Sequence, residues 1–356
     1  MPVNKKILNE YSRRFLREFK EDLLYEQGAH EKTVIRYMPI VINFGKWVQK
    51  NTTHHSFARV RAADIVAYRK DREKQHQGSG FATVVAGLRQ FYGFMVDKEY
   101  VLQSPISTRF KVRTHKNGNI TDVPSMQQFL EIRQSLDEKI QLYPESTHPD
   151  YRFRRLLFEG LAGTGMRLGA MATLIPSQIR WEHQSIFIDP QRMDTKHDAG
   201  YEARMTPYFA KLLREWIDEH SVGNDEIIFF QHPAHMRKWI SGLAPKCLWG
   251  FHPHTLRYFF ACAMYWRNLD GGRKDIIAVR DYLGHYSKSG SGLENTDKYT
   301  QMSRRILNYK DAEESDRLWT QFAYGNDAEP LVVNKQSNTS KQKEVASWHP
   351  GQRMIG

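Results

Sequence analysis

The stretch HPHTLRYFFA, residues 252–261, places a histidine and an arginine three positions apart in an apolar pattern with helical spacing. Residues three apart lie on one face of a helix, so His254 and Arg257 can reach a single ligand. Such a pair is common by itself. Its meaning therefore depends on the segments that surround it in the chain.

Two further segments place charged side chains at predicted helix ends. In LAGTGMRLGAMATL, residues 161–174, a Gly-Thr-Gly turn ends one helix and Arg167 starts the next, where free backbone N–H groups also favour an anion. In DYLGHYS, residues 281–287, His285 directly follows Leu-Gly, which predicts a helix C-terminus that holds the imidazole rigidly. Taken singly, a surface arginine and a structural histidine are the commoner interpretations.

A strand-like patch lies between these segments. SIFIDP and EARMTPY flank QRMDTKHDAG, residues 191–200, whose Asp-Ala-Gly predicts a hairpin turn with Lys196 near its tip. Further along, LENTDKYTQMSRR, residues 293–305, places Tyr299 between a Gly/Ser-rich run and a basic helical segment. Tyr299 is therefore either a packing aromatic or a nucleophile.

Together these segments resemble the tyrosine recombinase, or phage integrase, family. The family pattern is an arginine in a Thr-Gly-x-Arg turn, a lysine in a β-hairpin, His-x-x-Arg on a helix, Leu-Gly-His, and a tyrosine preceded by Thr-x-x. This sequence supplies all five segments in that order. The residues that match are Arg167, Lys196, His254, Arg257, His285 and Tyr299.

The resemblance implies metal-independent exchange of DNA strands through a 3′-phosphotyrosine intermediate. Arg167 and Arg257 would clamp the non-bridging oxygens on which charge builds during in-line attack. Lys196 would protonate the leaving 5′-oxygen, and Tyr299 would be the nucleophile.

The two histidines would position the phosphate and assist proton transfer. Of these, His285 is the stronger candidate to donate a hydrogen bond to a non-bridging oxygen, beside His254. No cofactor is expected. The resemblance also implies double-stranded DNA as partner, a dimer on each site, a homotetramer on synapsed sites, and room for accessory DNA-bending proteins.

The sequence departs from the family pattern in two places. Ala170 stands where many members carry an acidic residue that braces the first arginine, so another group must orient Arg167. The interval from His285 to Tyr299 is longer than usual and runs through YSKSGSGLEN, a segment expected to be flexible. A nucleophile delivered only in an assembled complex and a degraded site both fit such an insert, and the first is favoured because all six polar positions survive.

Three other tyrosines compete with Tyr299 for the role of nucleophile. Tyr286 is tied to the preceding turn. Tyr309 is expected three turns further along the same helix, where it would pack. Tyr258 occupies a position at which the family often has a second histidine, and it is expected to be structural.

Composition agrees with a DNA partner. The 356 residues hold 52 Lys+Arg against 40 Asp+Glu, a formal charge of +12, and the pI is near 9.5. A polyanion such as DNA would bind this excess. The two cysteines cannot form a disulfide framework, and neither a signal peptide nor a membrane span is predicted, so a cytoplasmic, nucleoid-associated protein of bacterial or phage origin is expected.

The predicted fold is mainly α with a small antiparallel β-sheet, in two domains. Residues 1–108 form a helical DNA core-binding domain, 109–121 a basic linker, 122–314 an α+β catalytic domain, and 315–356 a C-terminal helix and flexible tail. Helices are expected at 125–140, 151–163, 208–220, 255–269, 273–283 and 297–314. The candidate DNA-binding residues of the linker are Arg109, Lys111, Arg113 and Lys116.

Apolar stripes support the helical assignment of the first domain. The stripes in the first domain are Phe15/Phe19/Leu23, Tyr37/Val41/Phe44/Val48 and Val84/Leu88/Phe91/Met95.

A further apolar stripe beyond the catalytic helix could dock on a neighbouring protomer and gate Tyr299, or pack on its own domain. This later stripe is Leu318/Trp319/Phe322.

Site-specific recombination would serve to integrate, excise or transpose a mobile element or to resolve chromosome dimers. Two other functions compete with it. A metal-dependent nuclease or transposase needs converging carboxylates, and the catalytic half offers no paired acidic motif beside its basic segments. An inactive, sequence-specific DNA-binding regulator on the same scaffold would bind DNA but form no covalent adduct. The target sequence cannot be derived from these residues.

Overall fold

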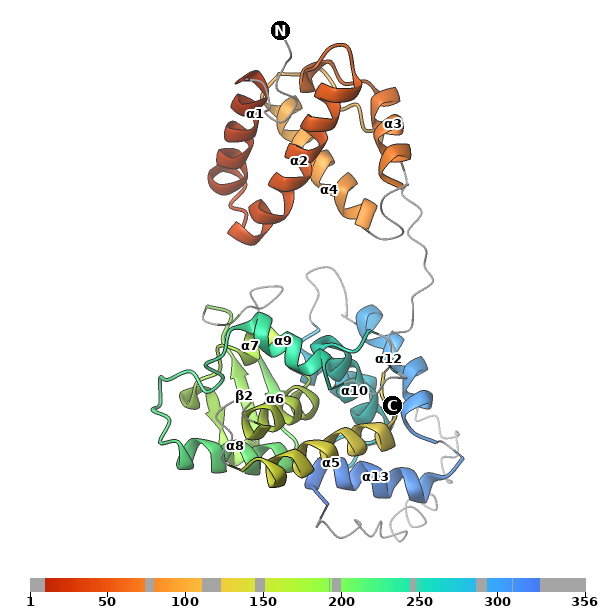
Figure 1. Cartoon of the computed structure of the whole chain (residues 1–356). Helices are drawn as coiled ribbons and strands as arrows, with labels where there is room; N and C mark the ends of the chain where they lie inside the picture. The colour runs from red at the N-terminus through yellow and green to blue at the C-terminus, as the bar shows by residue number, and fades with distance from the viewer. Residues whose placement is uncertain are drawn as a thin grey trace, which may run out of the picture. The chain divides into compact units, whose positions relative to one another are not determined.

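The computed structural model divides the chain into two compact units, Met1–Gly118 and Asn119–Gly356. Both are drawn in Figure 1. No helix among the described residues is long and apolar enough to cross a membrane. The structure describes residues 10–73, 80–110, 123–144, 151–191, 193, 200–243, 248, 250–285, 293–308 and 310–326.

The first unit is helical, as predicted. Its core is built from aromatic rings, with Phe44, Phe57 and Phe91 fully buried among others. The predicted stripes point into this core, except that Tyr37 and Val84 are only half-buried. Its elements are α1 (Glu10–Glu21), a π-helical turn (Asp22–Glu26), α2 (Glu31–Asn51), a 3₁₀ turn (Phe57–Arg59), α3 (Ala62–Glu73) and α4 (Gly80–Asp97).

Two arginines of the first unit hold the last described residue before the linker. The Arg89 guanidinium donates a 2.7 Å hydrogen bond to the carbonyl oxygen of Phe110. The Arg69 guanidinium lies 5.5 Å from the centre of the Phe110 ring. The chain is therefore fixed to this unit up to Phe110.

The second unit is mostly helical with one antiparallel sheet in the order β1-β2-β3, which confirms the predicted fold class. Ile186 of β2 pairs with Ile179 on one side and Ala203 on the other. Its elements are α5 (Met126–Leu142), α6 (Tyr151–Thr164), α7 (Leu168–Met171), β1 (Ile179–Arg180), β2 (Ser185–Ile188), β3 (Tyr201–Arg204), α8 (Pro207–Glu219), α9 (Pro233–Ser241), α10 (Pro253–Trp266), α11 (Ile276–Leu283), α12 (Leu293–Ile306) and α13 (Ala312–Tyr324), with 3₁₀ turns at Pro176–Gln178 and Trp181–His183.

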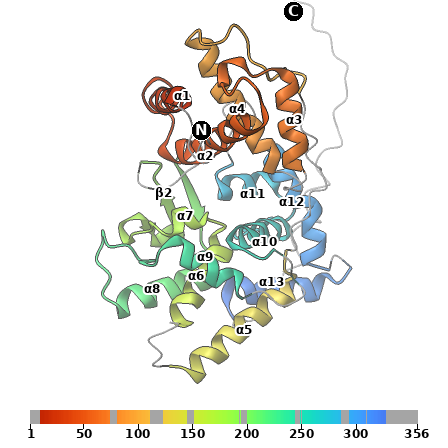
Figure 2. The same cartoon turned by 45° about the horizontal axis from the view of Figure 1, so that its top comes forward.

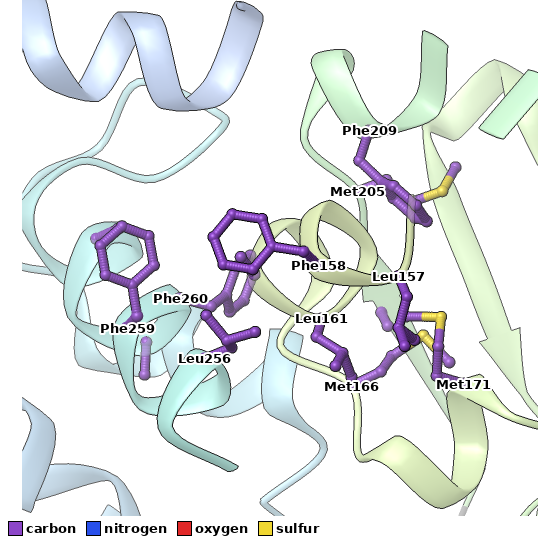
Figure 3. Packing of buried hydrophobic residues seen from close by; sticks show 14 of the residues in the cluster. Leu157, Phe158, Leu161, Met166, Met171, Met205, Phe209, Leu256, Phe259 and Phe260 are labelled. Carbon is purple, nitrogen blue, oxygen red and sulfur yellow. The ribbon is translucent and has the colours of Figure 1, made fainter. Parts of the chain in front are cut away.

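Helix α6 is the centre of the second unit. All of its residues from Arg155 to Thr164 are buried, as expected for a helix packed on every side. Figure 2 shows α10 beside α12, close to α6 and α9. Figure 3 shows the packing: side chains of α6 lie between aromatic and aliphatic side chains of α10 and a group from α7, α8 and the segments that precede these two helices. The labelled residues are Leu157, Phe158, Leu161, Met166, Met171, Met205, Phe209, Leu256, Phe259 and Phe260.

The prediction of one helix over 297–314 was wrong. Helix α12 ends at Ile306, and α13 begins at Ala312. Two short polar side chains bond to the backbone at the break: Asn308 Oδ1 accepts from the N–H of Lys310, and Asp311 Oδ1 accepts from the N–H of Glu314 as the N-cap of α13. Such bonds compete with a continuous helix. Tyr309 lies outside the described residues.

Helix α13 packs on its own unit. Trp319 and Phe322 are buried, and the Trp319 indole N–H donates to the carbonyl of Ala263 at 3.2 Å. The Phe322 ring meets the rings of Phe129 and Phe259 edge to face. In this structure the stripe therefore packs on its own domain, the second of the two alternatives, and docking on a neighbouring protomer stays a prediction.

A buried arginine fixes the end of α13. Arg133 of α5 is 1% exposed and donates to both carboxylate oxygens of Glu159, at 2.9 and 2.8 Å. It also donates to the carbonyls of Gln321 and Phe322 in the last turn of α13, at 2.5 and 3.0 Å. Carbonyls at a helix C-terminus have no intrahelical partner. Arg133 therefore caps α13 and ties it to α5 and α6.

Candidate active site

Helix α10 begins after His252, its N-cap residue, which orients the stretch that contains His254 and Arg257. His252 Nδ1 accepts from the backbone N–H of Thr255, and Thr255 Oγ1 accepts from the N–H of His252. This reciprocal capping fixes the first turn. The turn leaves His254 exposed, while Arg257 points inward and is 1% exposed.

Arg257 joins three segments that are distant in the sequence. Its guanidinium donates to the carbonyl of Gly165 at 2.5 Å and to the carbonyl of Leu283 at 2.7 Å. A third contact, at 3.0 Å, reaches His285 Nε2. Its Nε–H is buried and has no hydrogen-bond partner among the described residues. An unpaired buried donor is unfavourable, so an anion at this position would be stabilised.

Two glycines in the left-handed region shape the turns around Arg257. Gly165 has φ +63°, and a side chain there would run into Phe260 and Leu283. Gly284 has φ +60° and ends α11, as Leu-Gly-His predicted. Glycine adopts this conformation without strain, and both turns expose the carbonyls that Arg257 uses.

His285 lies between Arg257 and α12. Since a guanidinium can only donate, His285 Nε2 accepts from Arg257, which places the proton of a neutral imidazole on Nδ1. Nδ1 lies 3.1 Å from Thr296 Oγ1 and donates to it. In this arrangement Nε2 is occupied as an acceptor. It can donate to a phosphate oxygen, the role expected for His285, only after the contact with Arg257 opens and Nε2 gains a proton.

Tyr299 lies inside this group and is 2% exposed. Its ring is almost parallel to the His285 imidazole, with centroids 5.9 Å apart and planes 17° apart. On another side the Tyr258 ring lies 5.4 Å away. Its backbone carbonyl accepts from the Cys262 thiol at 3.5 Å. The structure thus brings Arg257, His285 and Tyr299 together.

Electrostatics distinguish Tyr299 from its neighbour. Burial raises the pKa of Tyr299, and the positive charges of Arg257 and Arg167 both act to lower it. Burial also raises the pKa of Tyr258, with Arg257 as the opposing charge. The net shift is upward, so Tyr299 is a neutral phenol in this structure, although both arginines favour its phenolate. A nucleophile needs these charges, or a base, to outweigh the effect of burial.

Arg167 occupies the predicted place before a helix. It is the N-cap residue of α7, is half-buried, and follows the turn at Gly165. Ala170 is buried in α7, where an acidic brace was noted as missing. The influence of Arg167 on Tyr299 shows that the two lie close enough to interact.

Several predicted residues lie elsewhere. Arg109 is exposed in the first unit, where its N–H donates to Ser107 Oγ. His254 is exposed, and the ring of Tyr258 lies 4.6 Å from its imidazole, between edge and centre of the site. β2 and β3 pair as the predicted hairpin requires. The remaining candidates lie outside the described residues: Lys111, Arg113, Lys116, Lys196 and the competing Tyr286.

The long interval before Tyr299 is partly helical. Helix α12 starts at Leu293, four residues earlier than predicted, so its first turn belongs to the segment that was expected to be flexible. That turn contains Thr296, the partner of His285. Thr296 is the threonine of the Thr-x-x-Tyr segment, to which sequence analysis assigned no role. Its position three residues before Tyr299, on the same helix face, was the available signal.

Asp275 caps the helix that positions His285. Its carboxylate accepts from the N–H groups of Ile277 and Ala278 at 2.9 and 3.0 Å. We expect Asp275→Ala to lower the free energy of unfolding by about 1 kcal/mol, because these two N–H groups lose their acceptor. Urea denaturation measures the loss, and Asp275→Asn should retain most of the stability. An equal loss in both variants would contradict capping.

The described residues contain no group of three His, Cys, Asp or Glu side chains arranged to hold a metal ion. Comparison with known families gives two matches. The phage integrase family matches residues 136–305, and the phage integrase N-terminal SAM-like domain matches residues 16–99. The chain belongs to the tyrosine recombinase, or phage integrase, family of site-specific recombinases. The order of the predicted motifs is thereby explained.

This integrase-family chain is similar in sequence to tyrosine recombinases and similar in fold to solved recombinase structures. Tyrosine recombinase XerC of Lacticaseibacillus casei (strain BL23) is 25% identical over 308 residues, which cover 81% of this chain and 94% of that protein. Among solved structures, XerH bound to palindromic difH in a post-cleavage complex has a TM-score of 0.60 at 18% identity and covers 83% of this chain and 82% of XerH. A lambda integrase tetramer bound to a Holliday junction has a TM-score of 0.56 at 14% identity, with 81% and 82% covered. These structures share the fold.

Proposed function

We propose that this protein cleaves and rejoins DNA at specific sites through a covalent 3′-phosphotyrosine intermediate. The observation that carries the proposal is the position of Tyr299, packed on His285 and influenced by both Arg257 and Arg167. Two guanidinium groups beside one phenol suit an in-line attack on a phosphodiester. The unpaired Nε–H of Arg257 is one donor that the phosphate would satisfy.

In the proposed reaction, Tyr299 forms the new bond, and Lys196 and the two histidines bind the phosphate or transfer protons. Tyr299 Oη loses its proton to a base and bonds to phosphorus, while the P–O5′ bond breaks and the 5′-oxygen takes a proton from Lys196. A second strand's 5′-hydroxyl reverses the attack, because the phosphotyrosine retains the energy of the original bond. His254 and His285 would place the phosphate and assist these proton transfers.

Double-stranded DNA is the proposed substrate, with two protomers on each site and four on synapsed sites. The charge of +12 supports a polyanionic partner. Several neighbouring structures are recombinases bound to DNA, one of them a tetramer on a Holliday junction. We further propose that the biological reaction integrates, excises or transposes a mobile element, with residues 1–108 and 122–314 as DNA-binding and catalytic domains joined by the basic linker.

The test is capture of DNA-linked protein from cells that contain the gene for this protein together with the DNA that flanks it. Cells are lysed in denaturant, covalent complexes are recovered, and both the attached DNA end and the linked peptide are sequenced. A 3′-phosphate joined to Tyr299, formed equally when EDTA is present, is the expected result. DNA binding without any adduct would refute the proposal and favour a regulator on the recombinase scaffold.

A further inference from the structure

Tyr258 connects the exposed edge of the site to its buried centre. It lies four residues after His254 on α10, so the two side chains share a helix face. Its ring meets the His254 imidazole edge to face at 4.6 Å and the Tyr299 ring at 5.4 Å. Exposure falls along this series: His254 is exposed, Tyr258 is half-buried, and Tyr299 is 2% exposed.

We infer that Tyr258 is a positioning residue for Tyr299, which its ring holds against His285 and separates from the water around His254. The inference rests on the proposed function, in which Tyr299 is the nucleophile. Tyr258 stands at a position where the family often has a second histidine. Its ring contacts the Tyr299 ring. The role assigned to it therefore goes beyond the structural one expected from sequence.

The contacts on the two sides of Tyr299 differ in strength. His285 is held by hydrogen bonds from Arg257 and to Thr296, at 3.0 and 3.1 Å, so that wall of the site is rigid. Tyr258 contacts Tyr299 by ring packing, with centroids 5.4 Å apart. Without that ring, Tyr299 could rotate away from the arginines, and a nucleophile displaced by about 1 Å can lose on the order of 100-fold in rate.

The effect is assigned to the Tyr258 ring, which makes both of these contacts. Tyr258 meets both neighbours through its aromatic face and edge, contacts that phenylalanine preserves. Burial raises the pKa of Tyr258, so its hydroxyl is neutral near pH 7, and its charge raises the pKa of Tyr299 only at a pH where Tyr258 ionises. Tyr258→Phe should therefore stay closer to the wild type than Tyr258→Ala.

The test begins with titration of Tyr299 in the full-length chain, without DNA. Tyrosine ring carbons are labelled, and the Tyr299 signal is assigned by its absence in Tyr299→Phe. The groups that face Tyr299 are Arg257, Tyr258 and Cys262 from α10, Arg167 before α7, and His285 after α11. Because burial is the main cause of the raised pKa, removing the Tyr258 ring should move the titration midpoint down towards that of an ordinary tyrosine.

Three variants give the expected pattern. Tyr258→Ala lowers the Tyr299 midpoint most, and Tyr258→Phe lowers it less, because phenylalanine removes only the charge that Tyr258 carries when it is ionised. Tyr265→Ala, which removes another half-buried tyrosine two turns further along α10, leaves the Tyr299 midpoint unchanged and controls for general loss of packing. A wild-type midpoint in Tyr258→Ala, or a Tyr258→Phe midpoint as low as that of Tyr258→Ala, would overturn the inference.

A second readout uses a synthetic duplex that carries the DNA ends recovered with the adduct. Tyr258→Ala should form the adduct at least about tenfold more slowly at saturating DNA, with unchanged DNA affinity, because only the orientation of Tyr299 is lost. Tyr258→Phe should restore the rate. If the wild type forms no adduct, the proposed function fails, while the titration still decides whether Tyr258 covers Tyr299.

Discussion

Tyr299→Phe is expected to abolish the covalent adduct while DNA affinity stays within about twofold of the wild type. In the proposed reaction the phenol oxygen bonds to phosphorus, so no packing or positioning group can replace it. We expect a loss of at least about 10⁴-fold, since removal of a nucleophile has cost about 10⁶-fold in a measured case. Because the ring remains, its packing on His285 and Tyr258 should persist.

Adduct formation is measured by denaturing gel shift on the recovered DNA site, and affinity by equilibrium binding at fixed salt. Tyr265→Phe is the matched control, since it removes a hydroxyl from another half-buried tyrosine of the same unit and should retain the adduct. An undiminished adduct in Tyr299→Phe, with the linked peptide mapped to another tyrosine, would reject Tyr299 as nucleophile.

Arg133→Met is expected to produce the largest change in stability. The substitution leaves Glu159, which is fully buried, with Arg155 as its remaining cationic partner, and it removes both donors to the end of α13. Breaking one side of a buried ion pair costs about 3–5 kcal/mol, because the partner charge remains buried. Methionine keeps much of the volume, so the loss reports the polar contacts.

Urea denaturation followed by circular dichroism gives the change, and hydrogen exchange of the α13 amides shows where it arises. Arg317→Met is the control: Arg317 makes a similar two-pronged pair with Glu314, but on the exposed face of α13. Exposed pairs contribute about 0–1 kcal/mol. If the two variants lost equal stability, Arg133 would not have the capping role that we assign to it.

The sequence predicted much of the site because its elements depend on local rules. A helix N-terminus follows from Gly-Thr-Gly before Arg167, and a helix C-terminus follows from Leu-Gly before His285. The three-residue spacing of His254 and Arg257 predicted a common face, yet one side chain is exposed and the other buried. A shared face fixes direction only roughly, and the depth of each residue depends on the elements packed against it.

The contacts that sequence analysis missed are those between distant segments. Arg133 reaches α13 across 188 residues, and Arg257 reaches Gly165 across 92. No periodic pattern encodes such pairs. The break between α12 and α13 could have been found, since Asn308 and Asp311 are residues that favour caps and turns. The short helix α9 was also missed, although His232 before a proline is a start signal.

The anchored Phe110 sets a limit on how far the two units can separate. The chain from Phe110 to the next described residue, Val123, comprises thirteen Cα–Cα steps (123 − 110). At ~3.6 Å a step, a fully extended tether reaches 47 Å. If both units bind one duplex, as proposed, a tether of that length gives the second contact an effective concentration on the order of millimolar. Two weak half-sites can then act as one strong site, and cutting the tether should reduce affinity far more than deleting any single contact.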